Sequence, residues 1–193
     1  MKKMIVFLML SVLGLGGCGS DGGDGAPATV LEGTWSRGCA SDGGGDYDKI
    51  TTTYSGSITN STYSVFSAID CSAGSAVVIM SGKGTFTVGE DIVLPGGDSA
   101  TKLNENYSSI LITLFDASYI ASFNQAQLCG KSNWEAGKQV EIAGCSDLIS
   151  SNLNFDIFKI NGNKLFFGDT ATGEGISDAT RPTQLETIFQ TKN

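Results

Sequence analysis

The chain has 193 residues, with 12 basic and 20 acidic side chains and a net charge of −8. That length suffices for one domain with a substantial core. The chain contains no histidine, so it lacks the commonest general base and the commonest transition-metal ligand. Few, scattered bases on an acidic chain cannot form the cationic face that nucleic acids require, so we expect no nucleic-acid partner.

The first residues have the pattern of an export signal. Lys2 and Lys3 form a short basic region, residues 4–15 are almost wholly apolar, and small residues follow as far as Cys18. This apolar run is shorter than the ~18 to 20 residues of a transmembrane helix, and no second run follows it. We therefore expect residues 1–17 to be removed as a signal peptide, which lowers the net charge to −10 because both lysines are lost.

Residues 15–18 read Leu-Gly-Gly-Cys and resemble the lipobox of bacterial lipoproteins. The resemblance implies that the Cys18 thiol carries a diacylglyceryl group and that cleavage falls just before it. Several acyl chains together anchor a protein durably to a membrane. The next residue is Gly19 rather than Asp, which by resemblance to Gram-negative sorting implies the outer membrane, on its periplasmic face or at the cell surface.

A flexible tether is expected between this anchor and the folded chain. Residues 18–29 are rich in Gly and Asp and show no apolar periodicity. Neither this stretch nor residues 41–48 supply the five or more oxygens at fixed offsets that a calcium loop needs. We therefore expect solvated loops there, and we predict no metal site and no cofactor. Residues 30–193 are expected to form one domain.

The remaining chain alternates apolar and polar residues and is punctuated by Gly, Ser, Asn and Asp, a pattern typical of half-buried strands. Nine strands are expected, at residues 32–37, 50–54, 62–70, 76–88, 107–115, 138–145, 155–160, 163–168 and 186–192. Their short connections predict an all-β fold, an antiparallel up-and-down meander that closes as a barrel to hide its edges. A two-sheet β-sandwich is the alternative.

Two local patterns refine this prediction. Asn161-Gly162 stands between two apolar runs and predicts a tight hairpin, in which these two residues are the centre of a type I′ turn. No segment predicts a helix of more than three turns. Residues 182–190 fit a short helix or a strand, and we favour the strand.

The first expected strand opens with Gly33-Thr34-Trp35, which is similar to the Gly-x-Trp signature of lipocalin barrels. In that family the tryptophan closes one end of the barrel beneath an arginine from a late segment. Arg181 is the only arginine near the C-terminus and is the expected partner of Trp35. Together with the lipobox, the chain resembles bacterial lipocalin-like outer-membrane lipoproteins. Other lipocalin motifs are absent from it.

Four cysteines remain after Cys18 is set aside, an even number in an exported protein, and they predict two disulfides. Three connectivities are open. We favour Cys39 with Cys71 and Cys129 with Cys145, because each pair links neighbouring segments of a meander. On the chain-entropy model each bridge contributes about 3 to 4 kcal/mol.

The sequence carries no motif for nucleophilic, phosphate or dinucleotide chemistry, so we do not expect an enzyme. Its acidic side chains are expected on solvated faces. Two hypotheses remain for a lipid-anchored envelope protein with a membrane as its first partner. Either the barrel encloses a small apolar ligand, or its interior is filled and its loops contact another envelope protein or a polysaccharide. The sequence makes no prediction of oligomeric state.

Overall fold

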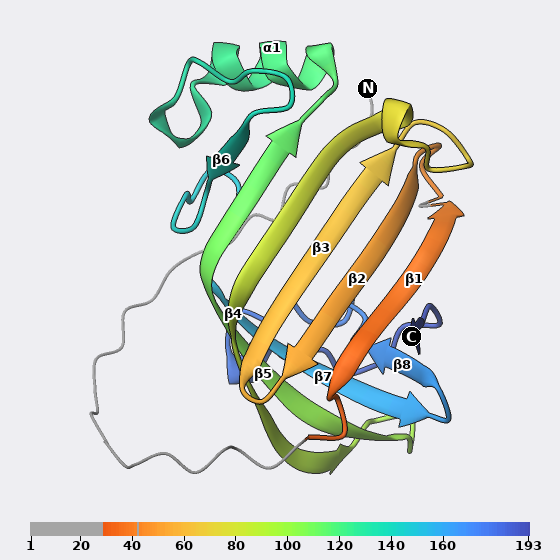
Figure 1. Ribbon diagram of the computed structural model, residues 1–193. Helices are drawn as coiled ribbons and strands as arrows, with labels where there is room; N and C mark the ends of the chain where they lie inside the picture. Colours follow the sequence, from red (N-terminus) through yellow and green to blue (C-terminus); the bar gives the residue numbers. More distant parts are fainter. Residues whose placement is uncertain (1–28, 42) are drawn as a thin grey trace.

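The computed structural model describes residues 29–41 and 43–193 (Figure 1). The predicted signal peptide, Cys18 and nearly all of the tether lie outside the described residues. The described elements are β1 (Gly33–Ser41), β2 (Tyr47–Ser55), β3 (Ile58–Phe66), β4 (Ala76–Val93), β5 (Ser99–Leu114), α1 (Ala117–Ala126), β6 (Gln139–Glu141), β7 (Leu153–Asn161), β8 (Lys164–Phe167) and β9 (Gln190–Lys192), with three short 3-10 turns.

Eight strands form a closed antiparallel barrel. β1 to β5 pair in chain order, and β5 then pairs with β7, β7 with β8, and β8 with β9. The last strand pairs with the first, because Trp35 lies opposite Lys192. The prediction of an all-β meander that closes as a barrel is confirmed, and the two-sheet alternative is wrong. Closure removes the free edges that an open sheet would expose.

The wall of the barrel is uneven in height. β4 and β5 have 18 and 16 residues, whereas β8 and β9 have only four and three. β5 therefore pairs with two strands along one edge: residues 101–106 pair with β7, and residues 111–113 pair with β6. In Figure 1 the upper part of β5 extends beyond β7 to about the level of the upper ends of β3 and β4, and it leads into α1.

A cap packs on this raised part of β4 and β5. We define the cap as residues 117–150, which comprise α1, the turns after it, β6 and the following loop. Its buried residues Phe123, Trp134 and Ile142 pack against Ile112 and Leu114 of β5. The rings of Phe123 and Trp134 meet edge to face with their centroids 5.2 Å apart. This cluster is separate from the cluster in the closed barrel.

α1 was not predicted from the sequence. Asp116 caps its first turn, since the carboxylate accepts hydrogen bonds from the backbone N–H groups of Ser118 (2.8 Å) and Tyr119 (3.1 Å). The helix ends at Ala126 and is capped by Gln127, which adopts the left-handed conformation at φ 52°. At 10 residues it is shorter than three turns. Within the described residues, no helix is long and apolar enough to cross a membrane.

Several predicted strands are shorter than expected. β6 covers three residues of the expected 138–145, and β9 covers three residues of the expected 186–192. The expected strand over residues 182–190 is mostly irregular, since only Gln190 of it belongs to β9. This segment instead folds back over the outer wall, where Leu185 packs beside Ile157.

The predicted hairpin between β7 and β8 is present, but its turn is displaced by one residue. Asn161 pairs with Lys164, so the two central residues are Gly162 and Asn163 rather than Asn161 and Gly162. Only Gly162 has a positive φ, of 63°. A type I′ turn needs positive φ at both central positions, whereas a glycine at the first position alone is typical of type II′. The type I′ prediction is therefore wrong.

Both predicted disulfides are confirmed. Cys39 near the end of β1 is bonded to Cys71 in the loop between β3 and β4, with their Cα atoms 5.8 Å apart. Cys129, in a 3-10 turn after α1, is bonded to Cys145, in the loop after β6, with a Cα separation of 5.3 Å. The first bridge ties the upper end of the barrel wall and the second ties the cap.

Candidate functional site

The inward face of β5 passes through three environments along a single strand. Leu103 belongs to the apolar cluster of the closed barrel, and Ile110, Ile112 and Leu114 belong to the cluster beneath the cap. Between them, Glu105 and Tyr107 face inward, as their pairing with Phe86 and Gly84 of β4 requires. A polar layer therefore separates two apolar ones inside the molecule.

Glu105 is the centre of this polar layer. It is only 5 % exposed, and its Oε1 accepts hydrogen bonds from the Tyr54 hydroxyl (3.2 Å) and the Thr59 hydroxyl (3.3 Å). Its Oε2 accepts one from the Asn154 side-chain amide at 3.0 Å. Burial raises the pKa of Glu105, and these hydrogen bonds offset part of the rise. The carboxyl is thus well bonded but far from water.

Two tyrosines complete the layer. Burial, followed by the charge of the neighbouring Glu105, raises the pKa values of Tyr54 and Tyr107 well above that of an ordinary phenol. Both hydroxyls therefore keep their protons at neutral pH and can donate them in hydrogen bonds. The Tyr107 ring lies directly over Gly82 of β4, where a Cβ atom would come within 2.7 Å of Cδ1 of the ring. Glycine at this position makes room for the ring.

A second carboxyl, Asp156, faces the same interior from β7, opposite Leu103 of β5. Burial, with a smaller contribution from the nearby charge of Glu105, raises the pKa of Asp156 to about 7. The backbone N–H groups of Ile157 (2.7 Å) and Gly168 (3.0 Å) donate to its Oδ1 and limit the rise. Two acidic groups that interact in a buried site titrate as a pair. This pair binds a proton near neutral pH.

The sequence interpretation missed these side chains because it assigned the acidic residues to solvated faces. That assignment is wrong for Glu105 and Asp156. A register shift between β4 and β5 leaves Ser108 as an extra residue, since Lys83 pairs with Ser109 and Gly84 with Tyr107. Such a bulge exchanges the two faces of a strand. Continued alternation from Ile110 would have placed Glu105 outside.

Trp35 and Arg181, which the sequence predicted to stack on each other, have different partners. Trp35 is 1 % exposed, and its indole N–H donates to the Leu31 carbonyl at 2.7 Å. The cation over its ring is Lys192, whose Nζ lies 5.3 Å from the ring centroid. Arg181 lies instead over Phe155, at 5.5 Å. The barrel-end contact thus pairs Trp35 with a lysine of β9.

Arg181 clamps two strands from outside the barrel. Its guanidinium is almost fully buried and donates to the Leu103 carbonyl of β5 at 2.8 Å and to the Asp156 carbonyl of β7. Asn104 and Asp178 accept further hydrogen bonds from it, at 2.6 and 2.7 Å. Because Leu103 and Asp156 are cross-strand neighbours, Arg181 braces the wall that carries both buried carboxyls.

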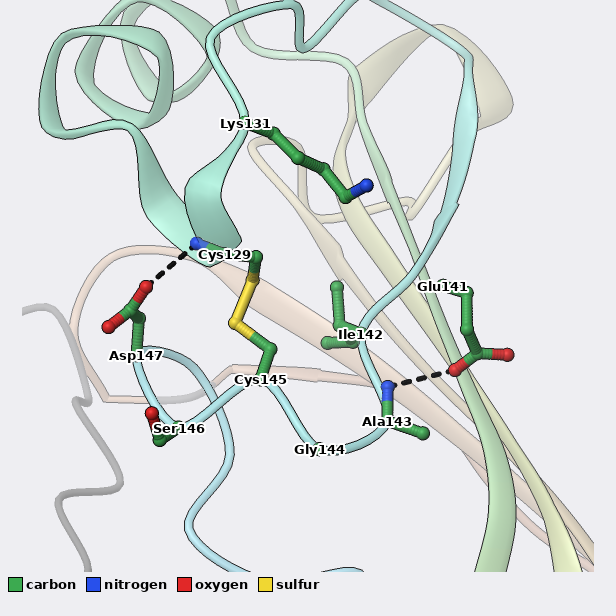
Figure 2. Close-up of a pocket in the computed structure, with 9 residues that line it drawn as sticks. All are labelled: Cys129, Lys131, Glu141, Ile142, Ala143, Gly144, Cys145, Ser146 and Asp147. Atoms are coloured by element: carbon green, nitrogen blue, oxygen red, sulfur yellow. Dashed lines mark hydrogen bonds between the residues drawn. A yellow bond between two sulfur atoms is a disulfide. The ribbon is translucent and has the colours of Figure 1, made fainter.

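Two pockets lie outside the barrel, on the cap. One has a volume of about 380 Å³ and is lined by the Cys129–Cys145 disulfide together with Lys131, Glu141 and Asp147 (Figure 2). The other has a volume of about 260 Å³ and lies between Lys131, Trp134 and β6. Neither pocket is lined by Glu105 or Asp156. The buried carboxyls and the cap pockets are therefore separate features.

No family model and no curated protein matches this chain. The fold itself defines the class: an eight-stranded antiparallel closed β-barrel, an architecture consistent with lipocalin-like proteins, with a disulfide-bonded cap over one end.

Proposed function

We propose that this protein is a lipid-anchored lipoprotein of the outer membrane, with a lipocalin-like, non-catalytic barrel that acts as a solid scaffold. Its anchor is the acylated Cys18, and the tether over residues 18–29 holds the barrel away from the membrane surface. Its loops contact another envelope protein or a polysaccharide. The opening Gly-x-Trp, the closed eight-stranded meander and the burial of Trp35 beneath a cation support the lipocalin-like assignment.

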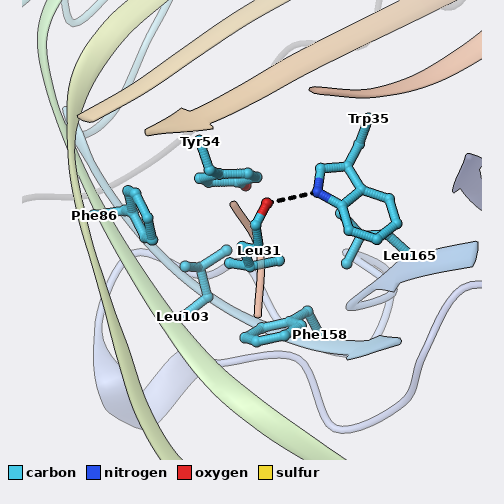
Figure 3. Close-up of a cluster of buried hydrophobic side chains, with 7 residues drawn as sticks. All are labelled: Leu31, Trp35, Tyr54, Phe86, Leu103, Phe158 and Leu165. Carbon is cyan, nitrogen blue, oxygen red and sulfur yellow. Dashed lines mark hydrogen bonds between the residues drawn. The ribbon is translucent and has the colours of Figure 1, made fainter. Parts of the chain in front are cut away.

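The observation that supports this proposal most directly is that the interior of the barrel is filled by side chains. Seven buried side chains pack together in its interior: Leu31, Trp35, Tyr54, Phe86, Leu103, Phe158 and Leu165 (Figure 3). Leu31 comes from the segment just before β1, is fully buried, and lies at the centre of this cluster. A carrier of a small apolar ligand needs an open apolar cavity of roughly 300 Å³ or more. Here the chain's own side chains occupy the apolar space.

The polar layer favours a scaffold over an enzyme. Two carboxyls converge inside the barrel, but Glu105 is only 5 % exposed and is ringed by hydrogen-bond donors from the chain itself. A general acid or base must come within hydrogen-bond reach of a substrate. Glu105 instead meets Tyr54, Thr59 and Asn154, each from a different strand, which supports a role in fixing the positions of the strands.

The filled interior is tested with a fluorescent apolar probe, 1-anilinonaphthalene-8-sulfonate, and with native mass spectrometry of protein extracted from its own membrane. Wild-type protein is expected to show no probe uptake and no retained lipid. Leu31→Ala removes the central side chain and is expected to create a cavity that takes up small apolar molecules. Leu153→Ala, at an exposed position, is the matched control. Retained lipid in the wild type would support the carrier hypothesis instead.

The membrane anchor is tested separately. Radiolabelled palmitate is expected to enter the wild-type chain and not the Cys18→Ser variant, and that variant is expected to leave the membrane fraction. Cys145→Ser is the control for cysteine loss in general and is expected to remain labelled. Membrane association of the Cys18→Ser form would contradict the proposed location.

A further inference from the structure

The Cys129–Cys145 disulfide stands at the wall of a pocket. Both residues are half-buried rather than enclosed, and both line the opening of about 380 Å³ on the cap. Figure 2 shows the sulfur–sulfur bond between the Asp147 side of the pocket and the Glu141 side, with Lys131 above it. A thiol that enters this pocket therefore meets a sulfur atom at its surface.

The other disulfide provides a comparison within the same chain. Cys71 is only 3 % exposed, and its carbonyl accepts a hydrogen bond from the Lys49 ammonium at 3.2 Å. Backbone conformation does not distinguish the two bridges, because Cys71 and Cys129 both have positive φ, at 45° and 57°. Access distinguishes them in part. Cys39 is half-buried, like Cys129 and Cys145, but it lines neither cap pocket, and its partner Cys71 lies in the interior.

We infer that Cys129–Cys145 is a site of thiol–disulfide exchange that takes small thiols and prefers cationic thiols over anionic ones. A thiolate attacks one sulfur, a mixed disulfide forms, and the other cysteine leaves as a thiolate. A second thiol then attacks the mixed disulfide. One protein disulfide is reduced to two cysteine thiols while two thiol molecules are oxidised to one disulfide. The protein is the oxidant in this exchange and is consumed by it, without turnover.

The preference for cationic thiols follows from the negative charge at the pocket. A carboxylate oxygen of Asp147 and the two sulfur atoms lie within 4.8 Å of one another, and Asp147 is held there by the Cys129 backbone N–H, at 2.7 Å. Burial alone would raise the pKa of Glu141, but hydrogen bonds from Ser109 and from backbone N–H groups together outweigh it and lower the pKa, so Glu141 remains ionised. Lys131 alone opposes these two negative charges among the lining residues. The field therefore repels an anionic thiol and attracts a cationic one.

The first test compares the two disulfides under native conditions. The folded full chain is incubated with 2-mercaptoethanol, free thiols are trapped with iodoacetamide, and modified peptides are quantified by mass spectrometry. Cys129 and Cys145 are expected to be labelled about tenfold faster than Cys39 and Cys71, in line with access to the attacked sulfur. Equal rates, or labelling of all four only at the rate of global unfolding, would overturn the inference.

The second test addresses charge. The rates with cysteamine and with glutathione are each divided by the rate of the same thiol on the urea-unfolded chain, which removes intrinsic differences in reactivity. Cysteamine is expected to be favoured by about threefold at low salt, and the preference is expected to fall as salt is added. Asp147→Asn is expected to accelerate glutathione and to slow cysteamine, which lowers the preference. Asp98→Asn, at the far end of the barrel, is the matched charge control. An unchanged preference in Asp147→Asn would refute the charge assignment.

Discussion

The closed barrel and the cap are built by different means. In the barrel, long-range strand pairing joins residues from both ends of the chain, as in the contact of Trp35 with Lys192. In the cap, a short helix, several turns and a three-residue strand are held by one disulfide and by packing on β5. The barrel thus depends on the whole chain, whereas the cap depends on local contacts and one covalent bond.

The two tryptophans make this difference concrete. Trp35 is 1 % exposed in the barrel and Trp134 is 4 % exposed in the cap. The indole N–H of Trp35 donates to the Leu31 carbonyl, whereas Trp134 Nε1 is buried with no hydrogen-bond partner among the described residues. The indole in the barrel is therefore better satisfied than the one in the cap. A region held mostly by local contacts opens more readily on its own.

Replacing each tryptophan by alanine should give the largest difference in stability between the barrel and the cap. Trp35→Ala is expected to lower the free energy of unfolding by about 3 to 5 kcal/mol, because it leaves a large cavity in the barrel. Trp134→Ala is expected to cost less in global unfolding, since the cap can open while the barrel stays folded. Urea denaturation measures the global loss, and amide exchange of cap residues measures the local one. Equal losses in one transition would mean that cap and barrel unfold together.

Between pH 5 and 8, the pH dependence of stability should come mainly from the buried carboxyls of the barrel. The chain has no histidine, so few ordinary groups titrate between pH 5 and 8. Asp156 has a pKa of about 7 in the folded protein and about 4 when unfolded. The folded state thus binds the proton more tightly, and the resulting stability, present below pH 4, is lost as pH rises through 7.

Between pH 5 and 8 the loss from Asp156 should be about 2 to 3 kcal/mol. Glu105 should add to it with the same sign, because burial also raises its pKa. Asp156→Asn keeps the hydrogen-bond acceptor without the charge and is expected to flatten the dependence, as measured by urea unfolding at the two pH values. Asp98→Asn, at an exposed carboxyl, should leave it unchanged. A dependence of unchanged size in Asp156→Asn would assign it to another group.

Gly82→Ala probes the contact between the polar layer and the wall. The new Cβ atom would lie 2.7 Å from Cδ1 of Tyr107, so the ring must shift within a packed interior. A cost of about 1 to 3 kcal/mol is expected, measured by urea denaturation. Gly38→Ala in β1, where nothing lies within 4 Å of the new atom, is the control and should be neutral. A neutral Gly82→Ala would show that the ring can move freely.

Much of the barrel could be predicted from the sequence, because alternation on one buried face is a direct consequence of strand geometry. In β4 the even residues from Val78 to Val88 face inward as predicted. The cysteine pairing followed from the meander, since neighbouring segments lie close in space. Periodicity carries this information wherever the strand remains regular.

The candidate site could not be predicted, because it depends on a β-bulge that interrupts the alternation of inward and outward residues along β5. The extra residue Ser108 reverses the faces of β5, so Glu105 is buried although the alternation from Ile110 places it outside. The cation over the Trp35 ring could not be predicted either, because it comes from β9 at the other end of the chain. The N-cap residue Asp116 was the available signal for α1, but it precedes a helix too short to show a clear repeat.

The smallest expected effect is the most specific one. Trp35→Phe removes the donor to the Leu31 carbonyl and leaves that buried oxygen without this partner, whereas Trp134→Phe removes an N–H that has no partner among the described residues. Both changes remove the same atoms, so their cavity terms largely cancel. Trp35→Phe should therefore cost about 1 to 2 kcal/mol more, the penalty for an unmade buried hydrogen bond. Amide exchange in each region is the measurement. Equal costs would mean that the Trp134 indole is bonded after all.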